Sequence, residues 1–246
     1  MSDVVVSQLW RFPVKSMGGH RVERCASTDA VCTPTGCGRS ATSRTASPRQ
    51  RGECRSCWGC SAAYGSEPGP DAGPGNVPEV TVTFPDGTEC SSSDDAVHGL
   101  LSELVGRELR LVALPPPVDD TSQHRMTMAD SLANFREAQV RKDFGLDDAE
   151  ALPDTSVFST KDIITLARFS TPPGTFVDLA PVHLMSSTSL ASLSATADAY
   201  DVRRFRPNVL VDVGQSDADF PETAWGGRRP RDRFGHFAGH DPDHPL

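Results

Sequence analysis

Three arginines and an asparagine fall within six residues near position 205 and lead directly into an apolar run. They are Arg203, Arg204, Arg206 and Asn208, followed by Val-Leu-Val at 209–211. A guanidinium group offers a rigid fork of donors that pairs bidentately with phosphate, and the amide of Asn208 adds a donor and an acceptor. Pro207 fixes the backbone between them. The segment predicts an anion site at the start of a strand, with a solvated patch of surface ion pairs as the alternative.

A second group of anion-binding residue types follows a strand-like Val-Val-Val run at residues 4–6. Lys15 brings a compact positive charge and Ser16 a hydroxyl, while Gly18 and Gly19 allow backbone N–H groups to approach a ligand closely. A turn with a solvated lysine is the simpler interpretation. Both interpretations place Lys15 and Ser16 in a loop just after a strand.

A third polar segment combines Asp178, His183 and a serine-rich stretch that contains Ser186 and Ser189. A lone carboxylate carries little catalytic signal, so we expect Asp178 to cap or orient its loop. We expect His183 to be a packed structural residue rather than a proton carrier.

These segments resemble the MOSC (molybdenum cofactor sulfurase C-terminal) family with its N-terminal β-barrel domain. The resemblance rests on Pro-Val-Lys-Ser-Met-Gly-Gly at 13–19, Asp-Leu-Ala-Pro-Val-His-Leu at 178–184 and Arg-Phe-Arg-Pro-Asn at 204–208, and it covers most of residues 1–31 and 61–226. It implies a mixed α/β, β-rich fold with β-barrel cores. It also implies binding of the molybdenum cofactor (molybdopterin), a pterin with a phosphate tail. Pyridoxal phosphate enters by family association only.

The activity implied by the resemblance is either reduction of N-hydroxylated compounds or sulfur transfer. The partners would be a small-molecule substrate and an electron or sulfur donor protein. The cofactor would lie between an N-terminal domain, residues 1–117, and a MOSC domain, residues 118–246. The residues expected to bind it are Lys15, Ser16, Ser186, Ser189, Arg206 and Asn208. No catalytic residue and no metal ligand is assigned, because the cysteine that coordinates molybdenum in the family is missing.

The composition favours a soluble, cytoplasmic protein that binds neither nucleic acid nor membranes. A chain of 246 residues with 37% hydrophobic residues can bury one large core or two modest ones. The net charge is −9 and no basic stripe is present, which argues against a nucleic-acid surface. No apolar run approaches the roughly 20 residues of a membrane span.

Six of the seven cysteines lie between residues 25 and 60, and Cys54, Cys57 and Cys60 have the spacing of a metal site. Against that, Trp58 is the only large apolar side chain in residues 32–60. Such a composition is typical of a GC-rich gene translated out of frame. Codons compatible with residues 32–37, read two bases later, give His-Pro-Asp-Gly-Val, a turn similar to the family's. We expect residues 32–60 not to form an ordered strand pair.

The chain after about residue 226 has the same character. Codons compatible with residues 232–246, shifted by one base, give a sequence ending in Thr-Ile-Arg and then a TG that can begin a cysteine codon. The family ends a strand with Arg-Cys at this place. His236, His240 and His244 are spaced by four, but glycines and prolines between them oppose the helix that a metal site would need.

The expected elements are short. Residues 79–84 alternate and precede a Pro-Asp-Gly turn, which predicts a hairpin. Ser93 is expected to cap a helix from Asp94 to Gly106. The remaining predictions are strands at 107–114 and 208–213, a linker at 115–117, a polar connector at 119–154 with a stop at Gly145, and helices at 160–167 and 189–197.

Two other classes of function stay open beside the enzyme. A carrier module for the molybdenum cofactor needs the same anion site but no thiolate. A cysteine-based metal protein would bind iron or zinc through the cluster at residues 54–60.

Overall fold

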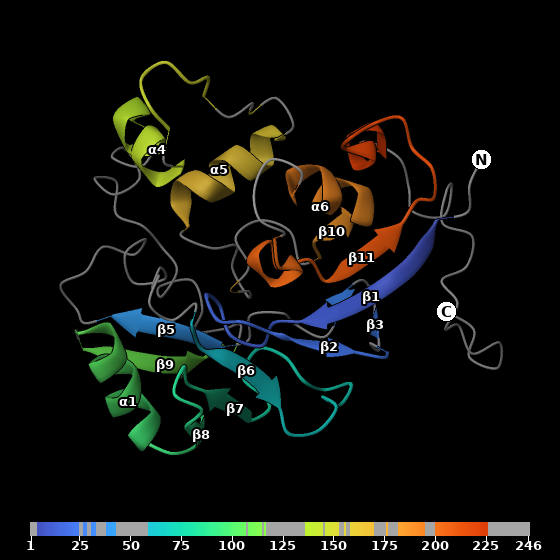
Figure 1. Ribbon diagram of the computed structural model, residues 1–246. Coiled ribbons are helices and arrows are strands. Elements are labelled where there is room, and N and C mark those ends of the chain that lie inside the picture. The colour runs from blue at the N-terminus through green and yellow to red at the C-terminus, as the bar shows by residue number, and fades with distance from the viewer. Residues whose placement is uncertain are drawn as a thin grey trace.

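The computed structural model of the chain is a mixed α/β fold, as expected (Figure 1). It describes residues 4–24, 27–28, 31–32, 38–42, 59–106, 108–114, 116, 136–144, 146–152, 155, 158–169, 176, 182–194 and 200–225. Within these residues the strands form four separate sheets, and none of the sheets closes into a barrel.

The largest sheet combines strands from the two ends of the chain. It consists of β10 (Leu184–Ser186), β11 (Val209–Asp212), β1 (Val5–Arg11) and β2 (His20–Val22), in that order. β1 pairs antiparallel with β11, with Leu9 opposite Val209, and β10 pairs parallel with β11. The sheet draws strands from both sides of the boundary expected near residue 117, and the division into two domains stays a prediction.

A parallel strand pair needs a crossover connection, and α6 (Ser187–Ser194) lies in the connection between β10 and β11. Figure 1 shows α6 beside these two strands. The apolar side of this sheet is built around Val209, Val211 and Val213, which are almost fully buried. The apolar run at residues 209–211 is therefore the buried strand β11, and its burial fixes the position of the residues just before it.

The predicted hairpin is confirmed. β6 (Ser61–Tyr64), β7 (Val80–Thr83) and β8 (Glu89–Ser91) form an antiparallel sheet. The turn between β7 and β8 is closed by the N–H of Phe84, which donates to the carbonyl of Thr88 at 2.8 Å. Gly87 has φ of 87°, a conformation that favours glycine.

The helix α1 (Ala96–Val105) buries Val97 and Leu101 in a core that it shares with this sheet and with β9 (Leu109–Ala113). It ends at Gly106, whose φ of 70° is left-handed, as expected for a helix stop. The expected cap by Ser93 is wrong. The N-cap residue is Asp95, and the hydroxyl of Ser93 instead donates to Glu79 at 3.0 Å.

The expectation that residues 32–60 lack strand pairing is wrong in one part. β5 (Gly38–Thr42) pairs antiparallel with β9 (Leu109–Ala113) over its whole length. A ladder joins main-chain N–H and C=O groups, so β9 can pair with a segment that has no large apolar side chains. The short strands β3 (Ser27–Thr28) and β4 (Val31–Cys32) also pair with each other. Residues 43–58 lie outside the described residues.

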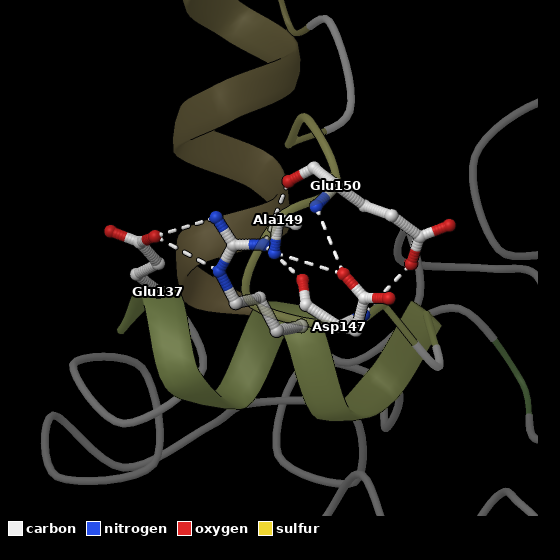
Figure 2. A network of polar contacts seen from close by, with 5 residues as sticks. Glu137, Asp147, Ala149 and Glu150 are labelled. Carbon is white, nitrogen blue, oxygen red and sulfur yellow. Dashed lines mark hydrogen bonds and ion pairs between the residues drawn. The ribbon is translucent and has the colours of Figure 1, made fainter.

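Two further helices lie in the middle of the chain. α5 (Thr160–Arg168) is capped by a reciprocal pair of hydrogen bonds between Ser159 and Asp162. α4 (Glu137–Phe144) begins at Glu137 and is followed by a turn that contains Asp147, Ala149 and Glu150, as Figure 2 shows. The guanidinium group of Arg141 holds this turn by donating to Glu137 at 2.9 Å and to the carbonyl of Asp147 at 2.6 Å. The expected stop at Gly145 lies outside the described residues.

The short helices η2 (Val202–Arg204) and η3 (Pro221–Trp225) flank β11 in the sequence. Among the described helices, none has the length and apolar character needed to cross a membrane.

Candidate functional site

The loop after β1 is fixed by burial on both sides of Lys15 and Ser16. Phe12, Val14 and Met17 are each at most 1% exposed, whereas Lys15 and Ser16 are half-buried. The N–H of Met17 donates to the carbonyl of Val14 at 3.3 Å, which closes a turn with Lys15 and Ser16 at its centre. We call residues 14–17 the lysine turn.

The side chain of Arg206 contacts the lysine turn directly. Its Nη1 atom donates to the carbonyl of Met17, and its Nη2 atom donates to the carbonyl of Val14 at 3.2 Å. The Cζ atom lies 4.5 Å from the centre of the Phe12 ring, a cation–π contact. Two groups predicted from distant motifs are thus brought together.

Both loops contain backbone strain. Ser16 has φ of 65° and Arg206 has φ of 54°, and they are the two non-glycine residues with positive φ in the described part of the chain. Such conformations cost of order 1–3 kcal/mol each and persist where the surroundings hold them, often at functional sites. Here the Arg206 side chain joins the two strained positions through the lysine turn.

Asn208 is buried and cross-links three segments. Its Oδ1 atom accepts a hydrogen bond of 2.9 Å from the N–H of His183, and its Nδ2 atom donates to the carbonyl of Trp10 at 3.5 Å. The carbonyl of Asn208 also accepts from the N–H of Trp10 at 2.8 Å. The amide predicted to bind a ligand therefore ties β1 and the start of β10 to β11.

Ser186 and Ser189 form a second cluster with Glu222, at the start of α6. Both serines are almost fully buried, and the Oγ atom of Ser186 accepts from the N–H of Ser189 at 3.0 Å. The same hydroxyl donates to Oε2 of Glu222 at 2.8 Å. Burial raises the pKa of Glu222, but hydrogen bonds from Ser189, its own backbone and Ser186 outweigh this and hold it below its ordinary value.

The predicted site residues fall into these two clusters. Arg206 contacts the lysine turn that contains Lys15 and Ser16, and Asn208 follows it just before β11, whereas Ser186 ends β10 and Ser189 lies in α6. Because β10 and β11 are parallel, with Ser186 opposite Val211, Ser186 is three register positions from Asn208. At about 3.3 Å per residue this is roughly 10 Å along the strand.

The other two arginines of the motif have internal partners. Arg203 donates to both carboxylate oxygens of Asp201, and this ion pair raises the pKa of Arg203 and lowers that of Asp201. The Cζ atom of Arg204 lies 4.9 Å from the centre of the Tyr200 ring. Arg203 and Arg204 thus make local contacts, as the alternative of a surface patch predicts. Arg206 differs, because its side chain contacts the lysine turn.

The glycine pair has a packing role. A Cβ atom on Gly19 would lie 2.1 Å from the carbonyl oxygen of Arg11 and 2.5 Å from the Phe12 ring. The N–H of Gly18 donates to the carbonyl of Cys60 at 2.8 Å. A Cβ atom on Gly18 would lie 3.3 Å from that carbonyl oxygen, so packing against β1 and Cys60 accounts for the glycine pair.

The expectation for His183 is wrong, because its side chain is exposed. The structural contribution of His183 comes from its main chain, because its carbonyl accepts hydrogen bonds from the N–H groups of Asn208 and Val209. Asp178, Cys54, Cys57 and the histidines of the C-terminal tail lie outside the described residues.

No group of three or more His, Cys, Asp or Glu side chains is placed to bind a metal ion in the described part of the chain. Burial raises the pKa of the Cys90 thiol, and the carboxylate of Asp94 raises it further.

A pocket lies elsewhere, beside β7 and β9. None of its lining residues is charged; they are Val77, Pro78, Val80, Ser92, Leu111, Val112 and Ala113.

Three parts of the site could not be found from the sequence: the ring of Phe12, the carbonyls of Val14 and Met17, and the carboxylate of Glu222. Carbonyls carry no side-chain signal, and Glu222 is one of 33 acidic residues. No protein-family model matches the sequence, and a comparison with curated proteins finds no relative. The resemblance to the MOSC family therefore rests on the motifs alone.

Proposed function

We propose that the chain binds the molybdenum cofactor through the phosphate of its pterin, at the lysine turn. One observation carries the proposal. The Lys-Ser motif and the Arg-Phe-Arg-Pro-Asn motif meet, although Met17 and Arg206 are 189 positions apart in the chain. These are the two motifs that the resemblance to the MOSC family assigns to cofactor binding.

The donor set of this site suits a phosphate. Lys15 supplies an ammonium group and Ser16 a hydroxyl, both on a turn whose flanking residues are fixed by burial. Charge-assisted hydrogen bonds of this kind are about twice as strong as neutral ones. Arg206 and Asn208 hold the loop and the strand start, and Ser186 at the end of β10 and Ser189 in α6 would complete the site.

The donor set does not suit the metal itself. The sequence has no cysteine after Cys90, and the raised pKa of that thiol keeps it protonated near neutral pH. When bound, the cofactor supplies redox chemistry or sulfur transfer to its proteins. Reduction of an N-hydroxylated substrate, with an electron or sulfur donor protein as partner, would therefore require the thiolate that a restored reading frame supplies.

The missing thiolate favours a second candidate, a cofactor carrier without catalysis. A carrier needs affinity for the pterin phosphate but no ligand that tunes the metal. In either case we propose a cytoplasmic protein with β-barrel cores, as in the family it resembles.

Binding of metal-free molybdopterin to the purified chain tests the proposal. We expect stoichiometric retention of the pterin after gel filtration, measured by the fluorescence of its oxidised form. Lys15→Ala should weaken binding about tenfold or more, because a hydrogen bond to a charged group contributes about 1.5–3 kcal/mol. Lys161→Ala, on the exposed face of α5, is the control and should bind as the wild type does. Equal affinity of the Lys15→Ala variant and the wild type would remove the lysine turn from the site.

The enzyme and the carrier are separated by restoring the downstream frame so that the chain continues through Thr-Ile-Arg-Cys. The restored chain should reduce an N-hydroxylated substrate when loaded with cofactor, and the chain as written should not. If both chains turn over at the same rate, the thiolate is unnecessary and the assigned chemistry is wrong.

A further inference from the structure

Arg206 binds the main chain of the lysine turn at both of its ends. The carbonyls of Val14 and Met17, which accept from its two terminal nitrogens, stand immediately before and after Lys15 and Ser16. A planar guanidinium group with two parallel donors can hold two acceptors at a fixed separation, which a lysine ammonium cannot do as a rigid unit. The two contacts therefore set the span of the turn.

The guanidinium group is itself held in place. The Phe12 ring lies against it at 4.5 Å, and Phe12 is 1% exposed and stacks in turn against Trp10 at 6.3 Å between ring centres. In the chain, Arg206 is followed by buried Pro207 and by Asn208, whose amide group is fixed between β1 and the start of β10. The side chain thus connects a rigid base to the lysine turn.

Ser16 has a positive φ, and the contacts of Arg206 with the lysine turn can stabilise this conformation. A serine in the left-handed region is strained, and it returns to a more favourable backbone conformation unless neighbouring contacts hold it. Of the contacts described for the turn, those of Arg206 are the ones made by a charged side chain, and they act on the carbonyls that bracket Ser16.

We infer that Arg206 is a positioning residue, which fixes Lys15 and Ser16 by binding the Val14 and Met17 carbonyls, and that its effect on an anionic ligand is transmitted through the lysine turn. The effect on a ligand rests on the proposed function, whereas the effect on the turn does not. A direct contact of Arg206 with phosphate, as the sequence suggests, is the competing role.

Amide hydrogen exchange in the ligand-free protein tests the inference on the turn. The N–H groups of Met17 and Gly18 donate to the carbonyls of Val14 and Cys60, so their exchange reports opening of the turn. Arg206→Gln should speed exchange at both amides about tenfold or more, since charged hydrogen bonds to two carbonyls are lost. Arg206→Lys should give a smaller increase, because the ammonium group keeps a charged donor but lacks the rigid fork that holds the two carbonyls at a fixed separation.

Arg203→Gln is the matched control. Arg203 lies three positions before Arg206, and the substitution removes the same charge from an exposed ion pair with Asp201. It should leave the exchange of Met17 and Gly18 unchanged. If Arg206→Gln does not fold, the same comparison is made with Arg206→Lys. Exchange at these amides that is the same in the Arg206 variants as in the wild type would overturn the inference.

A double-mutant cycle on molybdopterin affinity then separates positioning from direct contact. If Arg206 acts through the turn, Arg206→Gln weakens binding in the wild-type background but has little further effect in the Lys15→Ala, Ser16→Ala background. Equal losses in the two backgrounds would show a direct contact and overturn the inference. A wild type that binds no molybdopterin, with faster exchange still seen in Arg206→Gln, would refute the proposed function and leave the positioning role standing.

Discussion

Ser186 holds the carboxylate of Glu222 with two groups at once: its N–H donates to Oε1 at 3.1 Å and its hydroxyl donates to Oε2 at 2.8 Å. The contact joins the end of β10 to η3, 36 positions further along the chain. The start of a helix leaves N–H groups unsatisfied and carries partial positive charge, so an anionic side chain is favoured there.

Glu222→Gln should destabilise the protein by about 1–2 kcal/mol near neutral pH, because a charged acceptor for buried Ser186 is replaced by a neutral one. The pKa of Glu222 is depressed in the folded protein, so its contribution is complete above the ordinary value of 4.5 and is lost as the pH falls through the folded pKa. The difference between wild type and variant should therefore shrink at low pH. Urea unfolding over a pH series measures it, and a difference that is independent of pH would contradict the assignment.

Arg11 and Glu67 form a bidentate ion pair, at 2.9 and 2.6 Å, with Arg11 at 3% and Glu67 at 52% exposure. The hydrogen bonds from Arg11 are the main cause of a lowered pKa at Glu67. Glu67→Gln should destabilise the protein by about 1 kcal/mol, a value kept small because solvent screens the exposed carboxylate.

The stabilisation by this pair is present above the ordinary pKa of Glu67 and is lost as the pH falls through the lower folded pKa. Glu103→Gln, on an exposed position of α1, is the control in the same unfolding series. Equal effects of the Glu67 and Glu103 variants would show that the ion pair contributes nothing measurable.

Gly19→Ala and Gly99→Ala should have opposite effects on stability. The Cβ atom at residue 19 would overlap the Arg11 carbonyl and the Phe12 ring, so we expect a loss of about 2 kcal/mol or more. At Gly99, within α1, nothing lies within 4 Å of the added atom, and alanine should stabilise the helix by about 0.5–1 kcal/mol. Thermal unfolding of both variants measures the two signs, and a stable Gly19→Ala variant would show that the loop after β1 can move away.

The Cys90 thiol should react slowly with iodoacetamide in the folded protein. It is 9% exposed, and its pKa is raised by burial and by Asp94, so little thiolate is present near neutral pH. Peptide mapping by mass spectrometry should show labelling of Cys90 that rises steeply in urea. Labelling of the native protein as fast as that of the unfolded chain would contradict the buried position and would reopen Cys90 as a candidate metal ligand.

The sequence was most informative where a pattern and a turn agree. The alternation at residues 79–84 with Pro-Asp-Gly, and the helix expected from Asp94 to Gly106, predicted β7, its turn and α1 within about two residues. Ser93 was assigned wrongly because the helix begins two positions later, after Asp95, and the hydroxyl of Ser93 donates to the carboxylate of Glu79.

Site prediction from sequence identified residue types but not their partners. Arg206 and Asn208 were chosen as donors to a ligand, and in the structure their described hydrogen bonds go to the protein, mainly to main-chain groups. The strand at residues 38–42 was missed for the same reason: main-chain pairing leaves no trace in side-chain composition. Whether the six predicted residues bind a cofactor stays a prediction.

The pairing of β1 with β11 means that one edge of β1 stays unpaired during most of the synthesis of the chain. β2 can cover one edge of β1 as soon as residue 22 has left the ribosome, but the other edge waits for a strand 203 positions away, the separation between Ser7 and Leu210. At about 5–20 residues per second this wait lasts roughly 10–40 s. During that time β1 presents unpaired N–H and C=O groups to other nascent chains, so chaperone occupancy should fall sharply when residues 209–212 emerge.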